Sequence, residues 1–93
     1  MRTYEAACVF KAEEEKYQAS REEVLKVLKE LGAESIKEHD MAVRTLAYQI
    51  EGELQAHYLV FEFKMDPASA HQIEDRVKYF DDLLRILVTR QDD

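Results

Sequence analysis

The sequence predicts an α+β fold in which a four-stranded antiparallel sheet carries two helices on one of its faces. The first observation is that apolar residues alternate between a period of two and a period near 3.6, in the order β-α-β-β-α-β. The second is the length of 93 residues, which supplies one hydrophobic core but not two. The third is the scarcity of chain breakers, two Gly and one Pro, which indicates long elements and short connections. We therefore expect one domain over residues 1–91 and a short acidic tail at 92–93.

Residues 2–10 predict the first strand, because small, β-branched and aromatic residues alternate there. The apolar side of this strand consists of Tyr4, Ala6, Cys8 and Phe10. A polar connection with an acidic run, Glu13 to Glu15, follows over residues 11–19. Such a run is typical of a solvent-exposed loop.

The first helix is expected to begin at Ser20. Glu23 follows three residues later, which is the spacing of a capping box. Gly32 comes directly after the last apolar residue and is expected to form a left-handed C-terminal cap. The apolar stripe between these signals consists of Val24, Val27, Leu28 and Leu31.

Two strands are expected next, over residues 34–51 and 54–65, with a turn at Gly52. The polar, irregular segment 37–42 predicts a bend or bulge in the first of them. The predicted core faces consist of Ile36, Leu46, Tyr48 and Ile50 on one strand and Leu59, Phe61, Phe63 and Met65 on the other.

A second helix is expected from Asp66-Pro67, an N-cap followed by proline at the first helical position. Ser69 with Gln72 forms a competing capping box. The apolar stripe consists of Ala70, Ile73, Val77 and Phe80. Residues 83–90 predict the last strand, whose core face consists of Leu84, Ile86 and Val88.

Two βαβ halves with right-handed crossovers place both helices on one face of a sheet with strand order 4-1-3-2. This is the ferredoxin-like sandwich. The opposite face is left open, and its predicted residues are unusually apolar. Because contiguous apolar patches tend to be interaction surfaces, we expect a protein partner or self-association there, although scattered surface apolar residues are also normal. The expected partner-binding residues are Ala7, Val9, Tyr58, Val60, Glu62, Arg85 and Leu87.

The composition argues against several classes of function. The 13 Lys and Arg residues against 20 Asp and Glu residues give a net charge of −7, so a role with RNA needs a local basic patch or a basic partner. The single cysteine, Cys8, excludes an internal disulfide and a multi-cysteine zinc site, and is expected to be a small buried residue. The histidines at positions 39, 57 and 71 lack metal-ligand spacing and are interpreted as surface or edge residues.

Specific residues argue against further classes of protein. Residues 1–5 contain no apolar secretory core, and no apolar run approaches the ~20 residues of a membrane span, so we expect a cytoplasmic chain without a membrane partner. An RNA-recognition motif requires aromatic residues where Glu5, Ala7 and Val9 stand. No nucleophile motif, phosphate loop or acid/base pair is present, so no enzyme, cofactor, metal or small-molecule substrate is expected.

Three arginines remain as candidate RNA contacts. Arg2, Arg44 and Arg90 lie near predicted strand ends. The residues alone do not distinguish separate rim arginines from an RNA-contacting set.

The chain resembles the family of bacterial small-subunit ribosomal protein six, from Met1 to about Arg90. Its first five residues, Met1-Arg2-Thr3-Tyr4-Glu5, are similar to the family's Met-Arg-x-Tyr-Glu opening. Residues 44–50 are similar to the signature Arg-x-Leu-Ala-Tyr-Pro-Ile, with Gln49 in place of the proline. Ala42 stands where the family often has glycine, and Thr45 where a second basic or polar residue is common.

The resemblance implies a non-catalytic component of the small ribosomal subunit. It implies a heterodimer with ribosomal protein eighteen that binds the central domain of small-subunit ribosomal RNA. Carried over by position, the expected RNA-contacting residues are Arg2, Tyr4, Arg44, Tyr48 and Arg90. The rings of Tyr4 and Tyr48 are also expected to pack in the core. The alternative is a ferredoxin-like module for small-molecule regulation or protein interaction, although its only candidate ligand-admitting turn, at Gly32, is needed as a helix cap.

Overall fold

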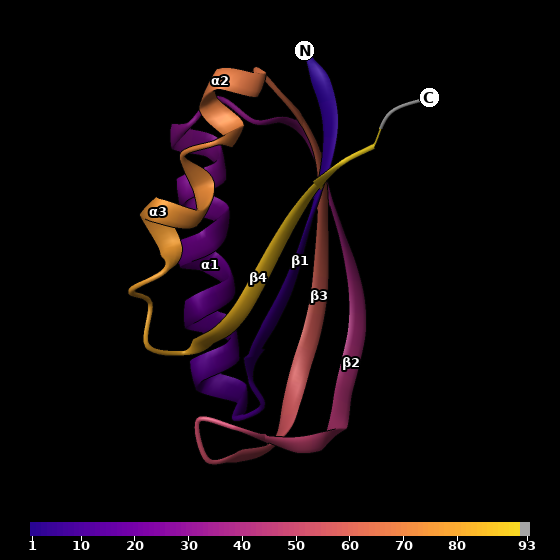
Figure 1. The fold of residues 1–93 in the computed structure, drawn as a ribbon, viewed down its shortest axis with the longest axis vertical. Helices are drawn as coiled ribbons and strands as arrows, with labels where there is room; N and C mark the ends of the chain where they lie inside the picture. Colours follow the sequence, from indigo (N-terminus) through magenta and orange to yellow (C-terminus); the bar gives the residue numbers. More distant parts are fainter. Residues whose placement is uncertain (92–93) are drawn as a thin grey trace.

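The computed structural model describes residues 1–91 and has the predicted ferredoxin-like architecture. Its elements are β1 (Arg2–Lys11), α1 (Glu14–Glu30), β2 (Glu34–Ile50), β3 (Glu53–Met65), α2 (Pro67–Ala70), α3 (Ile73–Val77) and β4 (Leu83–Arg90). The strands form one antiparallel sheet in the order β2-β3-β1-β4, which confirms the predicted order. All helices lie on one side of this sheet (Figure 1). The acidic tail predicted at residues 92–93 lies outside the described residues.

The core lies between the sheet and the helices. The alternation predicted for β1 and β3 is confirmed, because their core-facing side chains are almost completely buried. Ile86 and Val88 of β4 are partly buried and pack against this cluster. The largest fully buried side chains include Phe10, Phe61, Phe63, Leu28, Leu59 and Met65.

The predicted start of the first helix is wrong. α1 begins at Glu14, and Ser20 is a buried residue in its interior. The acidic run supplies the first turn, where carboxylates interact favourably with the positive end of the helix dipole. Tyr17 is buried and extends the apolar stripe by two turns, so the segment interpreted as a loop is helical.

The predicted end of this helix is confirmed. Gly32 has a φ of +92°, in the left-handed region that favours glycine. The amide of Gly32 donates to the Lys29 carbonyl at 3.0 Å, and the amide of Ala33 donates to the Leu28 carbonyl at 2.9 Å. This pair of bonds is a Schellman motif, which satisfies carbonyls that the helix itself leaves unpaired.

The second predicted helix starts where expected but is divided in two. Asp66 Oδ1 accepts a hydrogen bond from the Ala68 amide at 3.0 Å, with Pro67 at the first position of α2. A turn closed by the Gln72 amide on the Ser69 carbonyl separates α2 from α3. Ser69 lies inside α2, whose N-cap is Asp66, so the competing capping box does not begin a helix. The stripe residues Ala70, Ile73 and Val77 are buried as predicted.

The predicted irregularity of β2 is confirmed, but the core face of its C-terminal half is wrong. The pairing with β3 shifts between Asp40 and Val43, and again between Thr45 and Ile50. Tyr48 is 71% exposed rather than packed. The two register shifts break the strict alternation along β2, and Tyr48 lines a hollow with Tyr58 and Arg85, two of the predicted open-face residues.

Candidate functional site

The open face of the sheet brings the predicted partner-binding residues together in cross-strand rows. The pairing of β1 with its two neighbours places Ala7 beside Val60 and Leu87. The next row places Val9 beside Tyr58 and Arg85. Glu62 lies in a third row, opposite Glu5. The middle of the face is therefore apolar, with charged side chains on either side.

A hollow of about 290 Å³ lies in this apolar region. Ala7, Val9, Tyr58 and Val60 line it together with two residues of β2, Met41 and Arg44. Sequence reasoning missed Met41, because strict alternation along β2 does not hold across the bulge. The bulge predicted over residues 37–42 was the signal that could have found it.

The predicted RNA-contacting residues do not form one cluster. Arg2 pairs with Met65 at one end of β3, whereas Arg44 pairs with Ala56 at the other. These β3 positions are nine residues apart, which corresponds to about 30 Å along the strand. Arg90 pairs with Tyr4, so it belongs to the Arg2 end.

The two predicted tyrosines differ in their surroundings. Tyr4 is 7% exposed and its ring stacks on Phe63, with the ring centres 6.1 Å apart. The expected packing role of Tyr4 is therefore confirmed, and the residue also lines a hollow beside Arg90, His71 and Glu74. Tyr48, by contrast, is exposed on the hairpin near Tyr58 and Arg85, with which it lines a smaller hollow.

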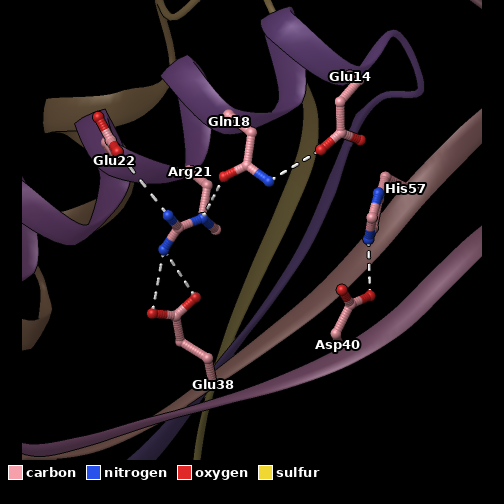
Figure 2. A network of polar contacts seen from close by, with 7 residues as sticks. All are labelled: Glu14, Gln18, Arg21, Glu22, Glu38, Asp40 and His57. Carbon is pink, nitrogen blue, oxygen red and sulfur yellow. Dashed lines mark hydrogen bonds and ion pairs between the residues drawn. The ribbon is translucent and has the colours of Figure 1, made fainter.

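The interpretation of His57 as a surface or edge residue is wrong, because its side chain is buried in the layer between α1 and the sheet. Its ring lies flat on the Tyr17 ring, with centres 3.5 Å apart and planes 2° from parallel. Its Nε2 lies 2.6 Å from Asp40 Oδ1 (Figure 2). The alternation along β3 placed position 57 on the core face, so the burial of His57 was predictable from the period. The polar residue type led to the opposite interpretation.

Electrostatic effects around this pair follow from these contacts. The Ala42 amide and His57 both donate to the Asp40 carboxylate, and this holds the pKa of Asp40 below its ordinary value of 3.8. Burial, together with the nearby negative charge of Asp40, raises the pKa of Tyr17 to about 12. Asp40 is therefore ionised and Tyr17 neutral near pH 7.

A second contact ties β2 to α1 near the same place. The Arg21 guanidinium binds both carboxylate oxygens of Glu38, at 3.0 and 3.2 Å (Figure 2). Gln18 accepts from Arg21 and donates to Glu14, so a chain of polar contacts runs along the start of α1. The outer strand is thus held against the helix by side chains, because within residues 1–91 no further strand pairs with its outer edge.

The described residues offer little for catalysis. Cys8 is 2% exposed, as expected for a small core residue, and burial raises its pKa to about 12, so its thiol is protonated near pH 7. Over residues 1–91, His, Cys, Asp and Glu side chains form no group of three that could hold a metal ion. None of the helices in the same range is long and apolar enough to cross a membrane.

Comparison with known proteins gives a consistent set of relatives. The family model for ribosomal protein S6 matches residues 3–90. Small ribosomal subunit protein bS6 of Borrelia turicatae is 36% identical over 88 residues, which are 95% of this chain and 66% of that protein. The bS6 protein of Borreliella burgdorferi (strain ZS7) is 34% identical and is 63% covered. The chain thus spans just under two thirds of the length of these curated relatives.

Two solved structures support the same fold. A crystal structure of 30S ribosomal protein S6 from Thermotoga maritima superposes with a TM-score of 0.83 at 23% identity, covering 97% of this chain and 87% of that one. The de novo designed protein Foldit4 matches with a TM-score of 0.59 at 15% identity, covering 100% of this chain and 99% of the design. At these identities the likeness concerns the fold alone.

Proposed function

Because the chain belongs to the ribosomal protein S6 family, we propose that it is a structural, non-catalytic component of the small ribosomal subunit in the cytoplasm. In this proposal it binds small-subunit ribosomal RNA, within the central domain, as a heterodimer with ribosomal protein eighteen. The observation that supports the contact with a protein partner is the apolar open face with its hollow.

The open face suits a protein partner on physical grounds. Its middle row includes Leu87, which is 61% exposed, beside Ala7 and Val60. Covering such a row removes apolar surface from water, which favours association with a partner. Charged groups at the margin, such as Arg85 and Glu62, supply orientation.

The RNA part rests on the arginines and on the overall charge. A protein of net charge −7 is repelled by phosphate at long range, so a basic partner has to supply most of the attraction. Arg2 and Arg90 lie at one end of the sheet and Arg44 near the other, so the RNA would be held at two separate places. Arg44 also lines the hollow, which supports a phosphate contact for it close to the docked partner.

The test compares two leucines that are almost equally exposed. Leu87→Asp places a carboxylate on the open face, whereas Leu54→Asp makes the same change on the β2–β3 hairpin; the wild-type side chains are 61% and 62% exposed. We expect Leu87→Asp to weaken heterodimer formation with ribosomal protein eighteen at least about tenfold, which corresponds to ~1.4 kcal/mol. Leu54→Asp should bind like the wild type. Equal binding by all three proteins, measured by isothermal titration calorimetry, would show that the open face is not the docking surface.

A further inference from the structure

The bulge in β2 places one extra residue opposite β3. Asp40 pairs with Leu59 and Val43 pairs with His57, so Met41 and Ala42 together face the single residue Tyr58. This local change of alternation lets both Met41 and Arg44 line the open-face hollow. The set of residues that line the hollow therefore depends on the bulge staying at this position.

The bulge is strained and needs support. Ala42 has a φ of +66°, a left-handed conformation that costs a residue with a Cβ roughly 1 kcal/mol. β2 is an edge strand, so pairing holds it on one side only. A register shift of one residue would exchange the side chains on its two faces.

Side-chain contacts converge on this strained segment. Asp40 Oδ1 accepts a hydrogen bond from the Ala42 amide at 2.8 Å and lies 2.6 Å from His57 Nε2. On the other side of the bulge, Arg44 Nε donates to the Met41 carbonyl at 3.1 Å. The Asp40 carboxylate is thus the link between the strained backbone and a side chain of β3.

His57 is a rigid anchor for this link. Its side chain is 10% exposed against 60% for Asp40, so the histidine is fixed by the core and the aspartate is not. Tyr17 covers one face of the imidazole, and Tyr17 itself packs edge-on against Phe10. One short hydrogen bond to His57 therefore fixes the position of Asp40 relative to the core.

We infer that His57 and Asp40 are a positioning pair that holds the β2 bulge in place and so puts Met41 and Arg44 on the partner-docking face. Neither residue touches the hollow; they act through the backbone of residues 41–44. The inference rests on the proposed function, since it assigns a role in docking to residues that lie on the helix-covered side of the sheet.

The hydrogen-bond arrangement determines which variants are informative. His57 Nδ1 is buried without a hydrogen-bond partner among the described residues. We therefore assign the hydrogen to Nε2, where it is donated to Asp40, because a buried N–H at Nδ1 would be left unsatisfied. An asparagine at position 40 can accept the same two hydrogen bonds through its amide oxygen.

The experiment uses three variants and one control. His57→Phe keeps a flat ring against Tyr17 but removes the hydrogen bond, and Asp40→Ala removes both bonds of the carboxylate. Asp40→Asn is the conservative variant that should restore them. Glu38→Gln is the control, because it weakens the neighbouring contact with Arg21 without touching the bulge.

Two readouts are needed. In the free protein, NMR cross-peaks between the Met41 methyl group and Tyr58 or Val60 report the bulge geometry. As the second readout, titration of each variant with ribosomal protein eighteen reports docking. We expect His57→Phe and Asp40→Ala to lose the cross-peaks and to bind about tenfold more weakly, as for the loss of one hydrogen bond to a charged group. Asp40→Asn and Glu38→Gln should stay within about twofold of the wild type.

The outcomes separate this inference from the proposed function. If His57→Phe and Asp40→Ala keep the Met41 cross-peaks, the positioning pair is wrong, whether or not binding changes. If wild-type protein does not bind ribosomal protein eighteen, the proposed docking function is wrong, and the cross-peaks alone decide whether the pair holds the bulge. Loss of the cross-peaks in Asp40→Asn as well would also contradict the inference, because the amide oxygen should be sufficient.

Discussion

At the scale of single residues, the two arginines with the strongest case for RNA contact lie too far apart to share a phosphate. Their β3 partners, Met65 and Ala56, are nine residues apart, or about 30 Å. Contacts this far apart with no shared neighbours usually contribute independently to a binding free energy. Arg2 and Arg44 should therefore act as separate anchor points.

Charge reversal tests this directly. We expect Arg2→Glu and Arg44→Glu each to reduce the affinity of the heterodimer for RNA, and the double variant to show the sum of the two free-energy losses within ~0.5 kcal/mol. Lys26→Glu is the matched control, since Lys26 is exposed on the outer side of α1. Fluorescence anisotropy at fixed salt measures all four proteins. An effect of Lys26→Glu as large as those at the arginines would mean that overall charge, and not position, governs binding.

Sequence reasoning was weakest for residues whose environment is set by distant parts of the chain. The burial of His57 depends on Tyr17, which is forty positions away in the sequence and lies in a segment predicted as a loop. The exposure of Tyr48 depends on how β2 pairs with β3, because the register shifts on either side of residues 43–45 break the alternation. Periodicity gives the face of a residue within its strand, but it does not give what covers that face.

At the scale of elements, the start of α1 shows how two local signals can compete. Ser20 with Glu23 has the spacing of a capping box, yet the helix begins six residues earlier at Glu14. The buried side chains of α1 are Tyr17, Ser20, Val24, Val27 and Leu28, which form one stripe. Burial of Tyr17 against Phe10 and His57 favours the longer helix over the cap.

Ser20→Ala distinguishes the two arrangements by the sign of its effect. The Ser20 hydroxyl is buried without a hydrogen-bond partner among the described residues, so removing it should stabilise the protein by about 1 kcal/mol. A capping serine would show the opposite, a loss of about 1 kcal/mol. Urea unfolding measures the difference, with Ala19→Ser, at an exposed position of the same helix, as the reverse control. A clear loss of stability on Ser20→Ala would contradict the structure of α1 given above.

Most elements were nevertheless predictable. β1, β3 and β4 agree with the predicted ranges within one residue at either end, because regular alternation and a continuous core face leave one consistent register. The Gly32 cap and the Asp66-Pro67 start are also confirmed, since each depends on local backbone chemistry. The division of the second helix at Gln72 had no such local signal.

At the scale of the whole molecule, an acidic chain has an apolar face and only a few cations at its strand ends. A net charge of −7 gives it little attraction for RNA by itself. In the proposed function, a partner of opposite charge docks on the open face, which has a hollow of about 290 Å³. We therefore expect RNA binding to belong to the pair and not to this chain alone.

The most direct test of that claim is fluorescence anisotropy with a labelled central-domain fragment of small-subunit ribosomal RNA. This chain, ribosomal protein eighteen and their mixture would be titrated separately across a salt series, whose slope estimates the number of phosphates contacted. We predict weak binding by this chain alone, and binding by the mixture at least about tenfold tighter than by ribosomal protein eighteen alone. Identical curves with and without this chain would contradict the account.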